Sequence, residues 1–259
     1  MKRLIYQVYV GKRSHLYDWC TDSVKEYAER IGADYICQRQ PLLRIKPDIF
    51  MTNRSKESYE KHGGYLPIYE KENAFSYFDK YDQIAIIDSD IYVRETAPDI
   101  FFELEPEYDF GGCVEAKMPM FDWYAQKILN YSRMQYGSLK IDWDYNPRTG
   151  FPFINMGMML MNKSFAKYLN GQTPKEFINR HEFKMFVDGM GPWKWSTDQT
   201  LLNYWIRNEN MNIKQMDWKW NGLYTACSRI MQCHFVHFFL KDKLPDRGEN
   251  VKFLKKEIL

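Results

Sequence analysis

The spacing of apolar residues changes several times along this chain of 259 residues, and each spacing predicts a type of element. Residues Leu4 to Val10 are rich in β-branched and aromatic side chains, which predicts a first strand. A helix is predicted next, where apolar residues recur at helical spacing: Val24, Tyr27, Ala28 and Ile31. Gly32 is suited to end that helix.

The same patterns recur along the rest of the chain. They predict strands at 35–38, 83–87, 109–114, 153–161 and 234–238, and helices at 69–78, 123–136 and 197–207. Residues 39–64 show little periodicity and predict an irregular connection, and residues 137–150 predict a polar loop. Because strands alternate with helices, we expect an α/β fold, a mostly parallel sheet covered on both faces in three α/β/α layers. No repeat or linker divides the chain, so residues 1–259 are predicted to form a single domain.

Composition and charge exclude several classes of protein. The net charge is +2, and no concentrated basic face is evident, so we expect no nucleic-acid partner. No segment approaches eighteen apolar residues, so no transmembrane segment is expected. The apolar run near the N-terminus is too short and too polar for a signal peptide. Aromatic residues make up 17% of the chain, which suits a core and also suits packing against sugar rings.

The cysteines indicate a reducing compartment. There are five of them, an odd number, and their spacing is irregular. A disulfide framework is therefore not expected, and we predict a cytoplasmic protein. Cys227, Cys233, His234 and His237 lie close enough in sequence to suggest zinc, but they lack a Cys-x-x-Cys pair.

Two carboxylates directly follow the most apolar strand. Within the strand predicted at 83–87, the run Ile84 to Ile87 is continuously apolar, as in a strand buried on both faces, and Asp88-Ser89-Asp90 follows it. Open α/β sheets bind ligands beyond the carboxyl ends of their strands. Ionised carboxylates at such a place need a partner, and hard oxygen ligands favour Mg²⁺ or Mn²⁺.

The Asp-x-Asp pattern alone is weak, because about one copy is expected by chance in a chain of this length. A second copy, Asp142-Trp-Asp144, lies in the polar loop and predicts a surface or acceptor-side position. Asp88 and Asp90 could also form a solvated turn. A phosphatase of the haloacid dehalogenase type has the motif after its first strand, whereas at least two strands precede it here.

Four stretches together resemble a known family, in the family's order. They are 81–93 (YDQIAIIDSDIYV), 153–162 (FINMGMMLMN), 197–203 (TDQTLLN) and 236–243 (VHFFLKDK). They resemble the segments of the glycogenin-like and lipopolysaccharide galactosyltransferase-like retaining glycosyltransferases of the GT-A fold. The resemblance extends from about residue 4 to about residue 245. It implies a metal-dependent enzyme that transfers a hexose from a nucleotide-diphosphate donor, expected to be a UDP-sugar, to a glycan or other hydroxyl acceptor.

Carried over position by position, the resemblance implies a role for each matching residue. Asp88, Asp90 and His237 would bind Mn²⁺ or Mg²⁺. Asp198 and Gln199 would act near the anomeric carbon as catalytic residues. The remaining donor-binding residues would be Tyr9, Val10, Gly11, Tyr17, Lys71, Ser89, Asn155, Gly157 and Lys243. His234 and His237 are three residues apart on one strand, so they should point to opposite faces and only His237 should reach the metal.

The chain departs from the family pattern near its end. Leu240 stands where the family has a glycine, and Leu244-Pro245 stands where it has Pro-Trp. Other classes stay open: an inactive carbohydrate-binding or scaffold protein of the same fold, and a haloacid dehalogenase-type phosphatase. A nucleotidyltransferase is disfavoured, because Gly11-Lys-Arg13 has one glycine where a glycine-rich phosphate loop would be needed.

Overall fold

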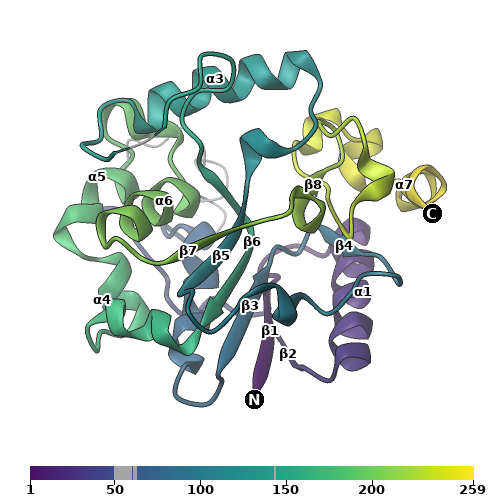
Figure 1. Cartoon of the computed structure of the whole chain (residues 1–259), viewed down its shortest axis with the longest axis horizontal. Coiled ribbons are helices and arrows are strands. Elements are labelled where there is room, and N and C mark those ends of the chain that lie inside the picture. The colour runs from purple at the N-terminus through teal and green to yellow at the C-terminus, as the bar shows by residue number, and fades with distance from the viewer. Residues whose placement is uncertain (50–59, 61–62, 143) are drawn as a thin grey trace.

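A six-stranded sheet forms the centre of the protein. The computed structural model describes residues 1–49, 60, 63–142 and 144–259, and Figure 1 shows the sheet crossing the molecule. The strand order is β2-β1-β3-β6-β5-β7. The strands are β1 (Arg3–Val8), β2 (Asp34–Gln38), β3 (Gln83–Ile87), β5 (Phe110–Val114), β6 (Ile154–Asn162) and β7 (Ile213–Met216).

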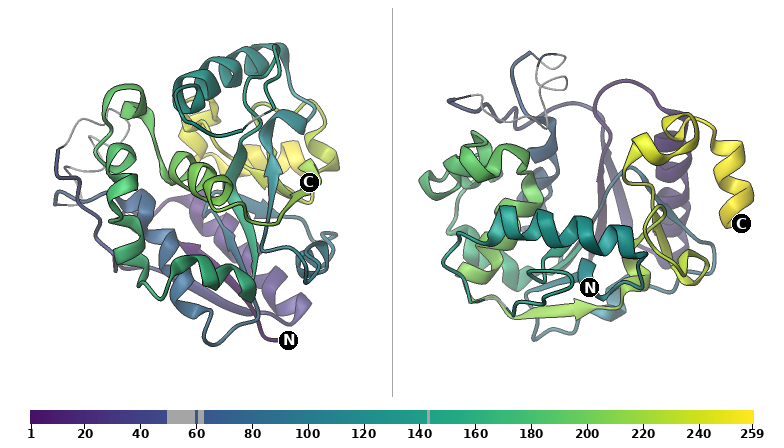
Figure 2. Two further views of the ribbon diagram at one scale, coloured as in Figure 1. Left: turned by 60° about the vertical axis from the view of Figure 1, so that its left-hand side comes forward. Right: turned by 90° about the horizontal axis from the view of Figure 1, so that it is seen from above.

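Helices follow most strands and cover both faces of the sheet. Among the described residues, the α-helices with defined bounds are α1 (His15–Ile31), α3 (Asp122–Tyr136), α4 (Pro174–Ile178), α5 (Lys184–Val187), α6 (Asp198–Asn208) and α7 (Val251–Ile258). The longer 3₁₀ segments are η1 (Pro67–Tyr77), η4 (Lys163–Leu169) and η6 (Gly191–Trp195). Figure 2 shows α1 and α7 on one side of the sheet and α4 and α6 on the other. The predicted α/β fold with helices on both faces is confirmed.

Alternate residues of the central strands enter two different cores. Tyr6 and Ile86 pack with Trp205 of α6. Ile5 and Ile87 pack with Tyr27 of α1. Successive side chains of a strand point to opposite faces, so a strand between two helical layers must be apolar at every position. This explains why all five residues of β3 are buried.

The sheet is mostly parallel, as expected, with one reversed strand. β1 runs parallel to both β2 and β3, and β5 runs parallel to β7. β6 runs antiparallel to both of its neighbours, β3 and β5. The register between β5 and β6 shifts between Gly112 and Cys113. Such irregularities re-aim side chains next to functional sites, and this one lies opposite residues 155–159 of β6.

A small second sheet was not predicted from the sequence, and it brings distant segments together. It consists of β4 (Ile91–Val93), β9 (Phe235–His237) and β8 (Gly222–Leu223) in the order β4-β9-β8. β4 directly follows Asp90, and Ile91 pairs with His237 across an antiparallel ladder. The backbone N–H of Phe238 also donates to the carbonyl of Asp90, at 2.9 Å. The last strand is thereby fixed beside the Asp-x-Asp turn.

Several predicted elements differ in extent or type. The first helix begins at His15, where Ser14 provides the N-cap, and it ends at Gly32 with a left-handed φ of 66°. The helix expected at 69–78 is the 3₁₀ segment η1, in which Tyr69 to Glu72 are all buried, so no single apolar face exists. Of the predicted irregular connection at 39–64, residues 50–59, 61 and 62 lie outside the described residues.

A buried carboxylate fixes the first part of that connection. Glu70 of η1 is fully buried. Its oxygens accept hydrogen bonds from the backbone N–H groups of Leu42, Leu43 and Arg44, and from Nε2 of Gln38. A buried charge is tolerated when several donors surround it. Glu70 therefore ties η1, and with it Lys71, to the end of β2.

The five cysteines are all free thiols in the structure, and four of them are buried. No helix among the described residues is both long and apolar enough to cross a membrane.

Candidate functional site

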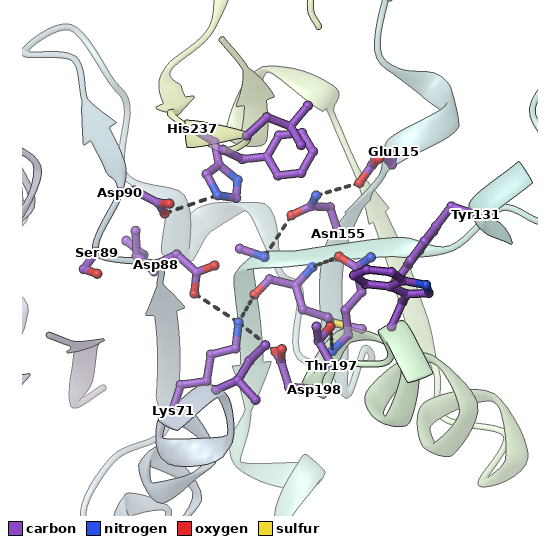
Figure 3. Close-up of a pocket in the computed structure, with 18 of the residues that line it drawn as sticks. Lys71, Asp88, Ser89, Asp90, Glu115, Tyr131, Asn155, Thr197, Asp198 and His237 are labelled. Carbon is purple, nitrogen blue, oxygen red and sulfur yellow. Dashed lines mark hydrogen bonds and ion pairs between the residues drawn. The ribbon is translucent and has the colours of Figure 1, made fainter. Parts of the chain in front are cut away.

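A cleft of about 760 Å³ opens at the carboxyl ends of β1 and β3. Its walls come from segments that are far apart in the sequence: the ends of β1 and β3, η1, α3, β6, the start of α6 and the segment after β9. Figure 3 shows their side chains pointing toward one another around the cleft. The Asp-x-Asp turn, Asp88 to Asp90, lines this cleft rather than the open surface.

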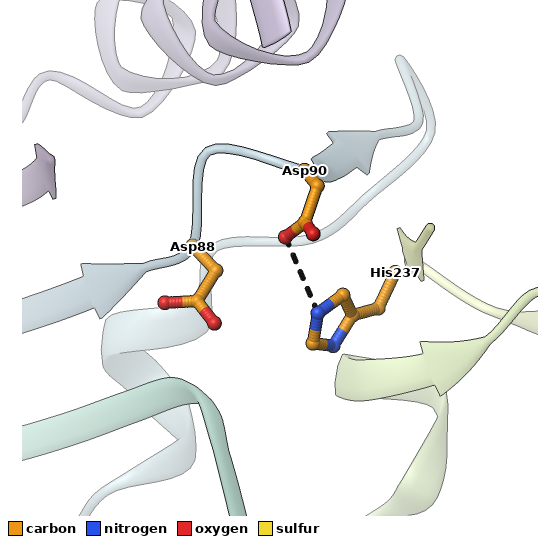
Figure 4. A group of neighbouring side chains, drawn as sticks. All are labelled: Asp88, Asp90 and His237. Atoms are coloured by element: carbon orange, nitrogen blue, oxygen red, sulfur yellow. Dashed lines mark ion pairs between the residues drawn. The ribbon is translucent and has the colours of Figure 1, made fainter. Parts of the chain in front are cut away.

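Asp88, Asp90 and His237 form a group that could bind a metal ion. One ligand atom from each residue lies within 4.8 Å of the others. Nε2 of His237 is 3.3 Å from Oδ1 of Asp90 (Figure 4). The exposed fraction is 31% for the Asp88 side chain and 18% for that of Asp90, while His237 is buried. Two carboxylates and an imidazole suit Mn²⁺ or a similar divalent cation.

The charges within this group shift one another's pKa values. Burial alone would raise the pKa of Asp90, but His237 outweighs it and lowers the pKa. Burial alone would lower the pKa of His237, but Asp90 outweighs it and raises the pKa. Burial raises the pKa of Asp88 to about 6, although Lys71 opposes the shift. Such shifts arise where negative charge is gathered in a desolvated place, as it is at many functional sites.

Lys71 lies beneath the carboxylates and joins two of them. Its Nζ is 3.0 Å from Oδ1 of Asp88 and 2.8 Å from Oδ2 of Asp198. It also donates to the carbonyl of Met156, at 2.7 Å. Burial would lower the pKa of Lys71, but Asp198 and then Asp88 outweigh it and raise the pKa. The ammonium is therefore charged, and it places Asp198 beside the Asp-x-Asp turn.

β6 and α6 form the floor of the cleft. Thr197 caps α6 by accepting a hydrogen bond from the backbone N–H of Gln199. Oε1 of Gln199 accepts from the N–H of Met156, at 3.3 Å. Asn155 lines the cleft, and its side chain donates to Oε2 of Glu115, at 2.6 Å. The structure thus brings the predicted residues Asn155, Asp198 and Gln199 together, and their roles at a sugar stay predictions.

Gly157 is required because the imidazole packs against it. A Cβ at this position would lie 2.4 Å from Cε1 and 2.7 Å from Nδ1 of His237. The carbonyl of Gly157 accepts from the N–H of Asp88, at 2.7 Å. Position 157 therefore contacts both His237 and Asp88, and only glycine leaves room for the imidazole.

We expect Gly157→Ala to displace His237. Overpacking of this kind costs about 1–3 kcal/mol, so thermal unfolding should shift downward and Mn²⁺ binding should weaken. Calorimetric titration with Mn²⁺ measures the second effect. In a His237→Ala background the ring that the new Cβ would meet is absent, so adding Gly157→Ala should lower the free energy of unfolding much less. An equal loss of stability in both backgrounds would show that Gly157 is not required by the packing of the imidazole.

Several of the residues that were predicted to bind the donor lie together at one side of the cleft. Tyr9, Val10, Tyr17 and Ser89 line it. The rings of Tyr9 and Tyr17 meet edge to face, with centroids 5.3 Å apart. Gly11 has a left-handed φ of 113°, is exposed and is not among the lining residues. It ends the strand segment rather than contributing to the wall.

Two lysines follow β9, and the structure places them differently. Lys243 is exposed, lies outside the lining residues and stacks on Trp123 at 4.1 Å. Lys241 is half-buried and lies 3.7 Å from the centroid of the Tyr17 ring. Burial lowers the pKa of Lys241, and the charge of Asp90 opposes this. Leu240, which lines the cleft, has a left-handed φ of 60°, a conformation that favours the glycine of the family pattern.

Sequence reasoning missed Glu115, Asn221 and Lys241. Glu115 directly follows β5, just as Asp88 follows β3, so the same strand-end rule could have found it. Asn221 precedes a strand of two residues that no periodicity reveals. Lys241 lies in the segment that resembles the family, where attention went to Lys243.

The alternative sites from the sequence do not form at this cleft. Asp142 and Asp144 are exposed and line a separate cavity. The ring of His234 packs at a tilt against Trp220, with ring centroids 4.8 Å apart, whereas His237 faces Asp90. The opposite orientation of the two histidines disfavours a zinc site that would need both with Cys227 and Cys233.

Comparison with known proteins identifies the fold. No family model matches the sequence, and no curated protein matches it significantly. Among solved structures, one similar to this chain is a glycosyltransferase involved in the glycosylation of the major capsid of PBCV-1. The two share 14% sequence identity, with a TM-score of 0.54 over 98% of this chain and 100% of the other.

The galactosyltransferase LgtC, in complex with donor and acceptor sugar analogues, is also similar. It has 11% identity and a TM-score of 0.51 over 91% of this chain and 87% of its own. An active-site mutant of LgtC matches with 12% identity and a TM-score of 0.54, over 98% and 96% of the two chains. These matches extend over nearly the whole chain, in agreement with the resemblance found in the sequence. The protein therefore has the fold of the GT-A glycosyltransferases.

Proposed function

We propose that this protein is a divalent-metal-dependent glycosyltransferase that uses a nucleotide-diphosphate sugar. The observation that carries the proposal is the group of Asp88, Asp90 and His237 inside the main cleft of a GT-A fold. Fold alone does not determine function, but a scaffold protein would have no need to keep three metal-ligand side chains converging in a cleft. UDP is proposed as the nucleotide because the family that the sequence resembles uses it.

The residues of the cleft suit the parts of such a donor. Asp88, Asp90 and His237 would hold Mn²⁺ or Mg²⁺, which would neutralise the negative charge that develops on the leaving diphosphate. Tyr9, Val10 and Tyr17 would hold the base and ribose. Lys241, whose charge interacts with Asp90, adds a basic group near that diphosphate. Lys243, proposed from the resemblance, would reach the diphosphate only by leaving Trp123.

The sugar would lie between the metal group and α6. The transferred sugar becomes oxocarbenium-like as the bond to the leaving group breaks. The carboxylate of Asp198 and the amide oxygen of Gln199 would stabilise that positive charge. Lys71 holds Asp198 at 2.8 Å and so fixes its orientation. Retention of the anomeric configuration is proposed from the resemblance alone.

The remaining part of the cleft suits a glycan or another hydroxyl acceptor. Its wall includes Tyr131 of α3 and Trp195 of η6, and Trp195 is partly exposed. Aromatic rings with one exposed face pack against the C–H faces of sugars. The acceptor hydroxyl would enter from this side, opposite the tyrosines that hold the nucleotide.

Calorimetry with a panel of nucleotide sugars, with and without Mn²⁺, tests the proposal. We expect one UDP-sugar to bind in Mn²⁺ and to be hydrolysed slowly when no acceptor is present. Tight binding of a guanine or thymine nucleotide would refute the base and leave the reaction class intact. Metal-dependent binding without hydrolysis or transfer would favour the inactive carbohydrate-binding alternative. Release of phosphate from phosphate monoesters would favour the phosphatase.

A further inference from the structure

The two ring nitrogens of His237 face different partners. Nε2 lies 3.3 Å from Oδ1 of Asp90, on the side of the cleft. Nδ1 lies 3.0 Å from Oδ1 of Asn221, which is buried below it. A neutral imidazole carries one proton, so one nitrogen donates and the other has a free lone pair. Which nitrogen carries the proton decides whether His237 can offer Nε2 to a cation.

A chain of hydrogen bonds behind His237 decides this question. The backbone N–H of Gly157 can only donate, and it donates to the side chain of Asn155 at 2.9 Å. The atom that it reaches must therefore be the amide oxygen of Asn155. The amide nitrogen of Asn155 then faces Oε2 of Glu115, at 2.6 Å, where it donates to a carboxyl oxygen. The contacts with Gly157 and with Glu115 therefore require the same orientation of the Asn155 amide.

The same reasoning extends one residue further. The side chain of Asn221 approaches Oδ1 of Asn155 at 2.9 Å, so the approaching atom must be its NH₂ group. Asn221 consequently turns its own oxygen toward His237. An oxygen accepts only, so Nδ1 of a neutral His237 must carry the proton, and the lone pair of Nε2 points toward Asp90.

We propose that Asn221 is a positioning residue for the metal site, and that Asn155 holds it in orientation. Asn221 keeps the proton of His237 on Nδ1 and thereby leaves Nε2 free to bind a cation. Without a cation or a second proton, the lone pair of Nε2 and an oxygen of Asp90 would face each other at 3.3 Å. A cation held by Asp88, Asp90 and His237 would remove this repulsion between the two acceptors. The inference rests on the proposed metal-dependent function for its purpose, but the position of the proton can be measured without any metal.

The fold explains how Asn221 comes to lie there. It is the last residue of η7 (Trp218–Asn221), directly before β8. β8 pairs with β9 in a register that places Leu223 opposite His237. Asn221 is 4% exposed, so water cannot replace the bond that it makes to the imidazole. Outer partners of a metal-bound histidine commonly fix its tautomer in this way.

Ring-¹⁵N NMR of the metal-free protein at alkaline pH, where the imidazole is neutral, tests the inference. In the wild type, the ¹⁵N shifts of His237 should show a protonated Nδ1 and a free Nε2. In Asn221→Leu we expect the proton to move to Nε2, where Asp90 accepts it. Binding of Mn²⁺ alone, followed by electron paramagnetic resonance, should then weaken roughly 10- to 100-fold.

Two further variants separate positioning from a loss of stability. Asn221→Asp keeps an acceptor opposite Nδ1 but loses the NH₂ group that donates to Asn155, so the tautomer should be retained while some stability is lost. Its Mn²⁺ affinity should stay above that of Asn221→Leu. Asn162→Leu removes a similarly buried amide at the far end of β6, where Asn162 bonds to Gln83 and to two backbone carbonyls. It should lower thermal stability without changing the Mn²⁺ affinity.

The possible outcomes are distinct. A proton on Nε2 in the wild type, or an unchanged tautomer in Asn221→Leu, would overturn the inference. The same loss of Mn²⁺ affinity in Asn162→Leu would show a general effect of destabilisation and would also overturn it. A wild type with the proton on Nδ1 that does not bind Mn²⁺ would refute the proposed metal-dependent function and leave the tautomer assignment in place.

Discussion

Replacing Asp90 by alanine should abolish most of the metal-dependent binding of the donor. Asp90 supplies one carboxylate of the metal group, and its partner Nε2 of His237 is only 3.3 Å away. Losing such a ligand should cost roughly 3 kcal/mol of binding free energy, or about 100-fold in affinity. Calorimetric titration of the UDP-sugar in Mn²⁺ measures this loss. In the presence of a chelator, wild type and variant should bind the donor equally weakly.

The chain contains a matched control for this experiment. Asp142 belongs to the second Asp-x-Asp, is exposed and lines a different cavity. Asp142→Ala removes the same charge from the same motif, so donor binding should be nearly unchanged. Thermal unfolding of both variants checks that they fold. Donor affinity that is equal with Mn²⁺ and with chelator in the wild type would refute the metal dependence itself.

The sequence predicted the structure best where the local pattern of apolar residues reflects burial directly. Ile84 to Ile87 is apolar at every position because both faces of the strand are covered, and the acids that follow could be placed at a sheet edge without any structure. The antiparallel direction of β6 could not be predicted. Its apolar run is compatible with either direction, because a strand that is buried on both faces has the same composition in both.

The contacts that complete the site could not be predicted, because they depend on pairing between segments far apart in the sequence. β8 and β9 bring Asn221 beside His237, and β9 and β4 bring His237 beside Asp90. These strands of two or three residues are too short for any periodicity. Lys71 was predicted as a donor contact from the resemblance, but its neighbours in sequence do not reveal that it pairs with Asp88 and Asp198. The predicted donor contact Lys243 lies over Trp123, outside the residues that line the cleft, and Lys241 lies over the ring of Tyr17, which does line it.

The two histidines of the last strand should respond in opposite ways to substitution by alanine. His237 is buried, faces Asp90 and is held from behind by Asn221. His237→Ala removes the nitrogen ligand from the metal group. We expect Mn²⁺ affinity to fall at least 10-fold, with the metal-dependent binding of the donor falling alongside it, since loss of a ligand should exceed loss of its outer partner. Electron paramagnetic resonance of Mn²⁺ and calorimetry of the donor measure the two effects.

His234→Ala provides the comparison, because His234 lies one residue before the same strand and points away from the cleft. Its ring packs at a tilt against Trp220, with centroids 4.8 Å apart, and burial lowers its pKa, so it is neutral at physiological pH. Losing that contact should cost about 1 kcal/mol of stability and leave Mn²⁺ binding nearly intact. The backbone bonds of residue 234, to Lys219 and Arg94, do not involve the side chain. If His234→Ala weakened Mn²⁺ binding and His237→Ala did not, the pairing of β9 with β4 would be one residue out of register, and the metal group would have to be rebuilt around the other histidine.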